Sequence, residues 1–416
     1  MLSLQEFASV VLLLSMAGAA AVLGNAGFSQ SLIKLLNPAN QDSLGPPDSL
    51  IAAGLLTSAA LGSAFAVILL AAPGLWVEES QQQLSRAGAI GAALCLAYVI
   101  QLYLGEVLRA QNKVFSATIL GNFGTYGGTL QNAVTLAWVA FLVPGSNDPL
   151  GTTILGLLLA SLACLAPLIL STMRNIDLGV SKLRRLNLRK LADMNGSNLV
   201  STGLFQVRGH IFLWSGALVV SASELAIYSA SNRLAAVFAL PAIVITYSVS
   251  YYLVARPGEE GRQVETRMRS LVTLVSLAVA PGLLALIIFA DRVGPLLLGA
   301  GYAAVGPVLI LQSLLGYTHI VMGGSSQALP LNGHHRKFMA YTFWSSSLGL
   351  ALLVPLAARY GALGMVAASL ITVWFHYALI LRAVQRHGLP RSHSYIRPAQ
   401  IRAALSSLHG RGVRAL

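Results

Sequence analysis

The chain has 416 residues, of which 56% are hydrophobic and only 10% are charged, and its mean hydropathy is +0.71. Since a soluble domain carries about 25% charged residues, this composition excludes an ordinary soluble protein and predicts a polytopic membrane protein. The net charge of +13 does not indicate nucleic-acid binding, because the basic residues lie between apolar segments instead of on one face of a soluble domain. Cys95 and Cys164 both fall within apolar segments, so we expect packing residues and neither a disulfide nor a metal site.

Along the chain, eleven stretches are long and apolar enough to cross a bilayer, whose hydrocarbon of about 30 Å takes about 20 helical residues. They are 7–33, 51–72, 87–108, 115–142, 151–171, 197–220, 225–254, 268–290, 302–325, 338–357 and 361–383. Two of them contain arginines, Arg208 and Arg233, and are predicted from pattern and length. The sequence therefore predicts an all-α protein with about eleven transmembrane helices.

The charges predict the orientation of these helices. With eleven crossings, 22 of the 27 Lys and Arg residues fall on one side, three on the other and two within predicted helices. Cytoplasmic loops carry the excess of basic residues, so we expect the linker at 174–196 and the C-terminus in the cytoplasm, and the N-terminus outside. Leucines alternate with the six basic residues of the linker. This pattern fits either an amphipathic helix on an anionic membrane face or an ordinary solvated linker.

Two parts of the chain resemble each other. The stretch EFASVVLLLSMAGAA at Glu6 is similar to ELAIYSASNRLAAVF at Glu224, and GTTILGLLLASL (151–162) is similar to GALGMVAASL (361–370). Corresponding helices enter the membrane from the same side, so we expect two parallel repeats, related by an axis along the membrane normal.

These repeats divide the chain into four predicted parts. The parts are a half of five helices at 1–173, the basic linker at 174–196, a half of six helices at 197–383 and a basic cytoplasmic tail at 384–416. The unequal helix counts predict an empty position beside 7–33, because nothing precedes that helix as 197–220 precedes Glu224. We expect the tail to be partly disordered, with a short amphipathic helix around Ile401 and Leu408, and to be dispensable.

Three motifs carry a resemblance to a known family: NAGFSQSLIKLL (25–36), ELAIYSASNRLAAVFALP (224–241) and the segment 293–338. In these the chain resembles the polysaccharide (O-antigen type) flippases of the multidrug/oligosaccharidyl-lipid/polysaccharide (MOP) superfamily, over essentially its whole length. The resemblance implies a twelve-helix fold that here lacks the first helix. The seventh helix of the family often carries an acidic residue where this chain reads VRGHIFLW (207–214), so a cation-coupling carboxylate is absent from that position.

The sequence offers few groups of residues that could carry out catalysis. A hydrolase or glycosyltransferase needs converging carboxylates, a triad or a metal cluster, whereas the outer loops hold only Glu78, Glu79, Asp148 and Asp291. His334 and His335 are expected to be solvated on a cytoplasmic turn. His210, His319 and His376 each lie alone in a predicted helix, where we expect interior histidines with hydrogen-bond partners more than proton carriers. We therefore expect a protein that is not an enzyme and needs no cofactor.

Arg208, Arg233 and Tyr247 are the candidate substrate-binding residues. A charged side chain near the bilayer centre costs at least about 2.5 to 3.5 kcal/mol and usually faces a cavity on a transport pathway. The alternative is that the arginines snorkel to the membrane surface. A tyrosine could line a sugar path.

These features predict a flippase in the cell (inner) membrane that translocates a polyprenyl-diphosphate-linked oligosaccharide by alternating access. The alternatives are an ion-coupled multidrug exporter of the same superfamily and a membrane scaffold that does not transport. We expect a monomer whose partners are the lipid-linked oligosaccharide, membrane lipids and polysaccharide polymerase machinery, and no nucleic acid.

Overall fold

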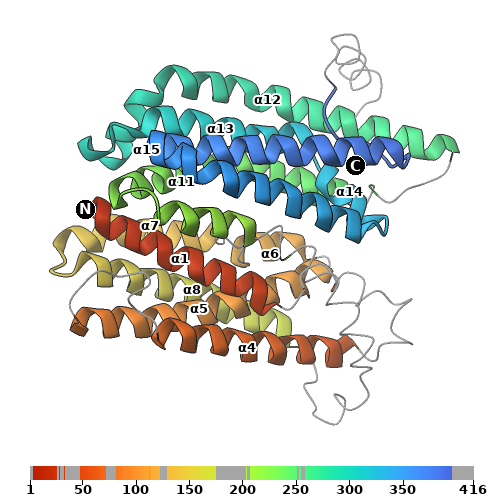
Figure 1. Ribbon diagram of the computed structural model, residues 1–416. Coiled ribbons are helices and arrows are strands. Elements are labelled where there is room, and N and C mark those ends of the chain that lie inside the picture. The colour runs from red at the N-terminus through yellow and green to blue at the C-terminus, as the bar shows by residue number, and fades with distance from the viewer. Residues whose placement is uncertain are drawn as a thin grey trace. The chain divides into compact units, whose positions relative to one another are not determined.

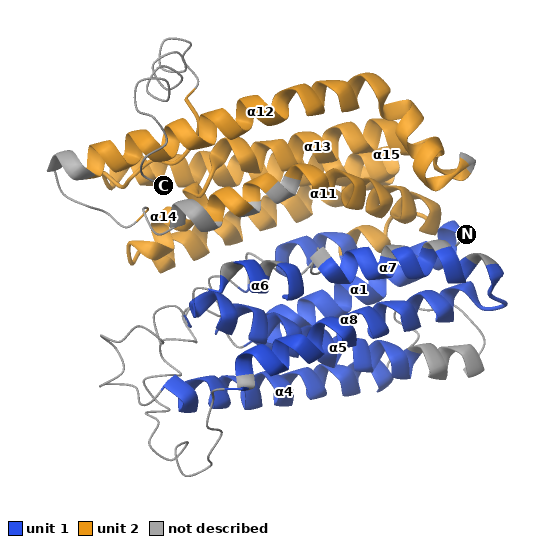
Figure 2. Cartoon of the chain, turned by 180° about the vertical axis from the view of Figure 1, so that it is seen from behind, with its two compact units in different colours: residues 1–214 blue, residues 215–416 orange. Residues whose placement is uncertain are grey.

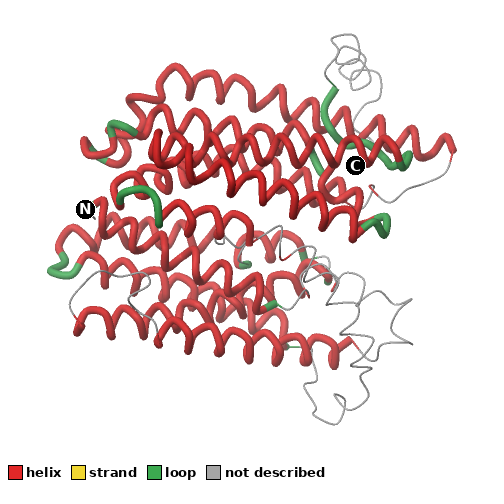
Figure 3. Tube along the Cα trace, viewed as in Figure 1, coloured by secondary structure: helices red, strands yellow, loops and turns green. Residues whose placement is uncertain are grey.

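All regular secondary structure in the described part of the chain is helical. The computed structural model describes residues 3–25, 28, 32, 47–71, 81–111, 113–121, 129–174, 203, 207–250, 253 and 258–395. Helices joined by turns account for these residues, with no strand among them (Figures 1 and 3). Seven of the described helices are long and apolar enough to cross a membrane. The expected all-α polytopic fold is thus confirmed.

Contacts divide the chain into two compact units, residues 1–214 and residues 215–416 (Figure 2). The first unit contains α1 (Leu4–Gly24), α4 (Pro47–Ala71), α5 (Gln81–Ala110), α6 (Val114–Leu120), α7 (Thr129–Leu142) and α8 (Pro149–Met173). Helix α5 lies at its centre and packs against α1, α4, α6 and α8. Small residues permit this packing, since Gly24 of α1 and Gly62 of α4 both lie against Val99 of α5.

The second unit contains α11 (Ala222–Ser250), α12 (Gly258–Leu298), α13 (Val305–Met322), α14 (Ser325–Leu331) and α15 (His335–Arg386). Helix α13 packs against α11, α12 and α15. Helix α15 contains a kink at Gly361, whose φ of 56° and ψ of −134° suit only glycine well. The carboxylate of Glu224 accepts a hydrogen bond of 2.7 Å from the Ala362 backbone N–H and so caps the helix after the kink. This kink separates the two spans predicted at 338–357 and 361–383.

The two ends of the second unit differ in charge. Glu224 at the start of α11, the kink of α15 and the contact between Gly306 and Asp291 lie at one end. The other end, called the basic end below, comprises the start of α12, α14, the end of α13 and both ends of α15. It carries Arg262, Arg267, Arg269, Arg336, Lys337, Arg382, Arg386 and Arg391. The charge asymmetry predicts that the basic end faces the cytoplasm.

Each of the eleven predicted spans coincides with helical residues in the described part of the chain. The span at 115–142 consists of α6 and α7, with residues 122–128 outside the described part. Of the basic linker only Arg174 is described, so its amphipathic helix and the boundaries of the predicted halves stay predictions.

Residues 207–214 belong to the first unit, and His210 contacts Ser15 of α1. The empty position expected beside 7–33 stays a prediction. In the first part of the tail, Leu389, Ser392 and Ser394 are buried, and the partial disorder expected of the tail stays a prediction. The predicted amphipathic helix around Ile401 lies outside the described residues.

Candidate functional site

Arg208 and Arg233 lie in different units, and their surroundings differ. Arg208 is half-buried in the helical residues 207–217. Arg233 is exposed on α11, eleven residues after Ala222, which corresponds to about 16 Å along the helix axis. That is about half of the hydrocarbon thickness of a bilayer. Arg233 therefore lies deep along its helix and far from the end that begins at Ala222.

The face of α11 that carries Arg233 is otherwise apolar. Val237 and Val244 are 66% and 62% exposed, and their spacing from Arg233 places all three on one side of the helix. The side chain of Tyr247 lies outside the described residues, so its part in a sugar path stays a prediction.

The carboxylate of Glu106 is neutralised within its own helix. Its Oε1 atom lies 2.5 Å from Nη1 of Arg109, and each of the two residues is only 8% exposed. The i, i+3 spacing places the two side chains on one face of α5, so the pair is local to this helix. Glu106 is the one carboxylate within the eleven predicted spans.

His210 is an interior residue, as expected. It is 1% exposed, and its Nδ1 atom lies 2.8 Å from Oγ of Ser15. The ring lies 6.2 Å from that of Trp214, one helical turn later. Nε2 is buried and meets no hydrogen-bond partner in the described part of the chain. The expectation of a fully hydrogen-bonded histidine is therefore met at one ring nitrogen only.

Two further histidines join helices of the second unit. Nδ1 of His319 on α13 lies 2.8 Å from the hydroxyl of Tyr377 on α15. Nδ1 of His376 lies 3.2 Å from Oγ of Ser345, so this contact joins the two parts of the kinked α15. Both arrangements are those of interior packing residues, which is what the sequence predicts.

A buried amide in the first unit was missed by the sequence reasoning. Gln131 of α7 is 1% exposed, and its Nε2 donates hydrogen bonds of 2.7 Å to the Tyr98 hydroxyl and 2.9 Å to Ser161 Oγ. The contact joins α5, α7 and α8. An amide within an otherwise apolar stretch was the available signal, because a buried amide needs partners.

The described residues contain no group of three His, Cys, Asp or Glu side chains that could hold a metal ion. Cys95 and Cys164 are free thiols and both are buried. Within these residues, the ionisable groups in the spans are arginines, histidines and the neutralised Glu106.

The sequence matches no protein-family model and no curated protein. Solved structures do resemble the fold. An inward-facing multidrug resistance MATE family transporter of the MOP superfamily has a TM-score of 0.63 at 12% identity, covering 97% of this chain and 92% of its own. The lipid II flippase MurJ, in an inward closed conformation, has a TM-score of 0.66 at 12% identity, covering 98% and 89%.

A MOP superfamily transporter from Pyrococcus furiosus is also similar, with a TM-score of 0.62 at 14% identity over 91% of this chain and 87% of its own. At these identities the likeness concerns the fold alone. The expected fold is confirmed, and the resemblance to O-antigen type flippases stays at the level of sequence motifs. The chain has the fold of the transporters of the MOP superfamily.

Proposed function

We propose that the protein is a flippase that moves a polyprenyl-diphosphate-linked oligosaccharide from the inner to the outer leaflet of the cell (inner) membrane. The observation that carries the proposal is the charge of the spans. The one carboxylate among the predicted spans, Glu106, is paired with Arg109, whereas Arg233 lies about 16 Å along its helix and Arg208 is half-buried. The intramembrane ionisable groups therefore favour an anionic substrate.

A diphosphate needs such cations. An unpaired anion in a low-dielectric space is strongly disfavoured, and the planar guanidinium offers two parallel hydrogen bonds to phosphate oxygens. With the cytoplasm negative, outward movement of the anion is downhill by about 2.3 kcal/mol per charge per 100 mV. A carboxylate that carries coupling protons is then unnecessary, in agreement with VRGHIFLW at 207–214.

The second candidate is an ion-coupled multidrug exporter, which the fold also permits because MATE transporters are among its structural neighbours. An exporter of cations favours acidic side chains in its cavity, and the charges of this chain are of the opposite kind. The MOP superfamily transporter from Pyrococcus furiosus has a binding pocket of reversed polarity, which suggests a different function for that protein. One fold thus accommodates pockets of either polarity. A scaffold without transport is the third candidate.

The partners follow from the same proposal. They are the lipid-linked oligosaccharide, membrane lipids and the machinery that polymerises the glycan after its export. We propose a monomer that needs no cofactor, with the basic end of the second unit and the C-terminus in the cytoplasm. Tyr247 is proposed to contact the sugar.

Transport of a fluorescent polyprenyl-diphosphate oligosaccharide in proteoliposomes tests the proposal. Arg233→Ala, and Arg208→Ala to a smaller extent, should lower the initial rate at least about tenfold, because about 1.4 kcal/mol of lost phosphate contact corresponds to that factor. Lysine at either position should retain part of the rate, since it keeps the charge and loses the fork. Arg292→Ala is the matched control: this arginine is exposed near the end of α12, and its loss should leave the rate unchanged.

Full activity of the double variant Arg208→Ala, Arg233→Ala would contradict the proposal. Uptake of a cationic drug driven by an ion gradient, without transport of the diphosphate lipid, would favour the exporter. Absence of both activities in a folded wild-type protein would favour the scaffold.

A further inference from the structure

Residues 389–395, here called the strap, follow α15 and return to the basic end of the second unit. Helix α15 ends in a turn in which the Leu389 N–H donates to the Val384 carbonyl over 3.0 Å and Gly388 has a φ of 61°. This is a Schellman-type helix end, which glycine permits because it adopts positive φ without strain. The turn directs the strap back along the helices it has just left, and Leu389 is buried there.

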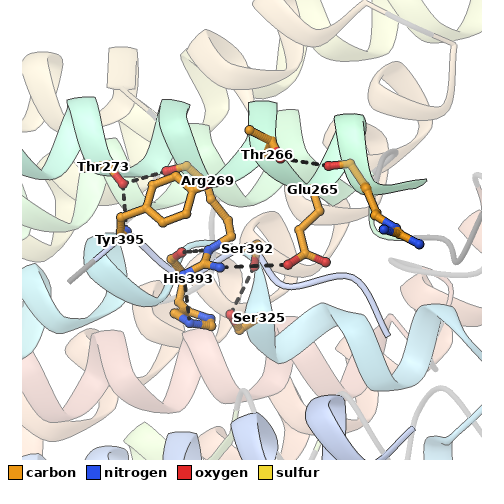
Figure 4. A network of polar contacts seen from close by, with 9 residues as sticks. Glu265, Thr266, Arg269, Thr273, Ser325, Ser392, His393 and Tyr395 are labelled. Carbon is orange, nitrogen blue, oxygen red and sulfur yellow. Dashed lines mark hydrogen bonds and ion pairs between the residues drawn. The ribbon is translucent and has the colours of Figure 1, made fainter. Parts of the chain in front are cut away.

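The strap contacts three helices through both backbone and side chains (Figure 4). The Ser394 N–H donates to the Val321 carbonyl at the end of α13 over 2.8 Å. The Tyr395 N–H donates to Oγ1 of Thr273 on α12 over 2.8 Å. Oγ of Ser392 lies 3.0 Å from Oγ of Ser325, the first residue of α14. Seven residues thus connect α12, α13 and α14.

Arg269 of α12 provides a fourth contact. Its Nε donates to the carbonyl of His393 over 3.2 Å, and its guanidinium carbon lies 4.2 Å from the centre of the Tyr395 ring. Figure 4 shows the guanidinium beside these strap residues. The carboxylate of Glu265 on the same helix lies 3.9 Å from Nη1 of Arg269. The strap therefore supplies most of the groups that surround this charge.

The turn before α14 is adapted to the strap. Gly323 has a φ of 55°, and a Cβ atom there would lie 2.8 Å from the carbonyl oxygen of Ser392. Any other residue would meet both backbone strain and a collision with the strap. Gly323 thus allows the strap to approach the turn before α14 closely.

From these contacts we infer that the strap is a reversible latch: it holds the basic ends of α12, α13 and α14 together, and transport requires its release. The segment is short, and its contacts are mainly hydrogen bonds at the end of the unit. Backbone groups freed there can bind water, so release costs far less than opening the apolar core. The inference goes beyond the proposed substrate, because it concerns movement of the second unit and not the recognition of a phosphate.

A reversible cross-link tests whether release is required. Ser325→Cys and Ser392→Cys, in a background with Cys95→Ala and Cys164→Ala, should form a disulfide, since the two hydroxyl oxygens are 3.0 Å apart. Transport of the diphosphate lipid by the oxidised protein should fall at least about tenfold and return when the bond is reduced. Either single cysteine variant is the control and should not respond to oxidant. Full transport by the oxidised double variant would overturn the latch.

A second measurement is independent of any substrate. In the same background, a maleimide should label Ser392→Cys at least about tenfold more slowly than Gln385→Cys, because Ser392 is fully buried and Gln385 is exposed. Arg269→Ala should accelerate labelling of Ser392→Cys. If the Arg269→Ala variant does not fold, Thr273→Val replaces it and should also accelerate labelling. Arg267→Ala, an exposed arginine two residues away, should not. Equal labelling at positions 392 and 385 would overturn docking of the strap even if the proposed substrate were wrong.

Discussion

Two arginines of long helices are stabilised in different ways. Arg109 in α5 contacts Glu106 of the same helix at 2.5 Å, and both residues are almost fully buried. Arg269 in α12 is half-buried and lies against the carbonyl of His393 and the ring of Tyr395, while the carboxylate of Glu265 is 3.9 Å away. One charge has a local, ionic partner, and the other depends on a segment more than a hundred residues later in the chain.

The difference separates a permanent contact from a removable one. A buried carboxylate and guanidinium three residues apart stay close while the helix is intact, and separating them would leave buried charges without a partner. The contacts of Arg269 with the strap end when the strap departs, and water can then solvate the guanidinium. The first arrangement suits a rigid packing element, and the second suits a part that moves.

The largest expected effect is the loss of the ionic partner. Glu106→Ala leaves a buried guanidinium beside a removed carboxylate, and this should lower the free energy of unfolding by about 3 to 5 kcal/mol. The matched control is Glu265→Ala, which should cost less than about 1 kcal/mol because that carboxylate is partly exposed and distant. Denaturation of the purified proteins in detergent measures both changes in the free energy of unfolding.

A double variant refines this prediction. Replacing Glu106 and Arg109 together by methionine should restore much of the stability, because apolar side chains carry no desolvation cost. Equal stability of Glu106→Ala and the wild type would show that the buried pair contributes nothing.

A smaller effect is expected at the aromatic contact of Arg269. Tyr395→Leu removes the ring beneath the guanidinium and should weaken docking of the strap by about 0.5 to 1 kcal/mol, whereas Tyr395→Phe should keep it. The rate of maleimide labelling at Ser392→Cys reports the change, as an increase of about two- to fivefold. If phenylalanine and leucine were equivalent, the ring would not support the arginine.

A further effect is a dependence on pH at the strap, which grows as the pH falls. Burial, and to a lesser extent Arg269 and Arg391, lower the pKa of His393 to about 4; Tyr395 and Glu265 are the other ionisable groups around Arg269. The pKa of a free imidazole is about 6.5, so the released strap binds a proton that the docked strap does not. Docking is therefore complete above about pH 6.5 and weakens as the pH falls towards 4.

Labelling of Ser392→Cys relative to the exposed Gln385→Cys should accordingly rise below pH 6.5, and this normalisation removes the intrinsic effect of pH on the thiol. His393→Asn should abolish the rise, because the amide does not titrate. A rise that persists in His393→Asn would assign the pH dependence to another group.

The sequence alone determined the class of the protein and the places of its spans. A bilayer demands about 20 apolar residues per crossing and leaves no backbone polar group unpaired, so composition and length are sufficient to predict eleven helical segments, all of which coincide with described helices. The charged residues Arg208, Arg233 and Glu106 could also be identified from the sequence, because a charge stands out within an apolar segment. The kink at Gly361 also follows a boundary between two predicted spans.

Only the tertiary structure decided which segments lie together. The tail resembles a solvated basic segment by composition, yet Ser392, Ser394 and Tyr395 contact atoms of α14, α13 and α12 that lie more than 60 residues earlier. His210 likewise contacts Ser15 across nearly two hundred residues and places its helix in the first unit. Hydropathy is a property of each segment, whereas a hydrogen bond needs two groups at a defined distance, and that distance is set by how the whole chain packs.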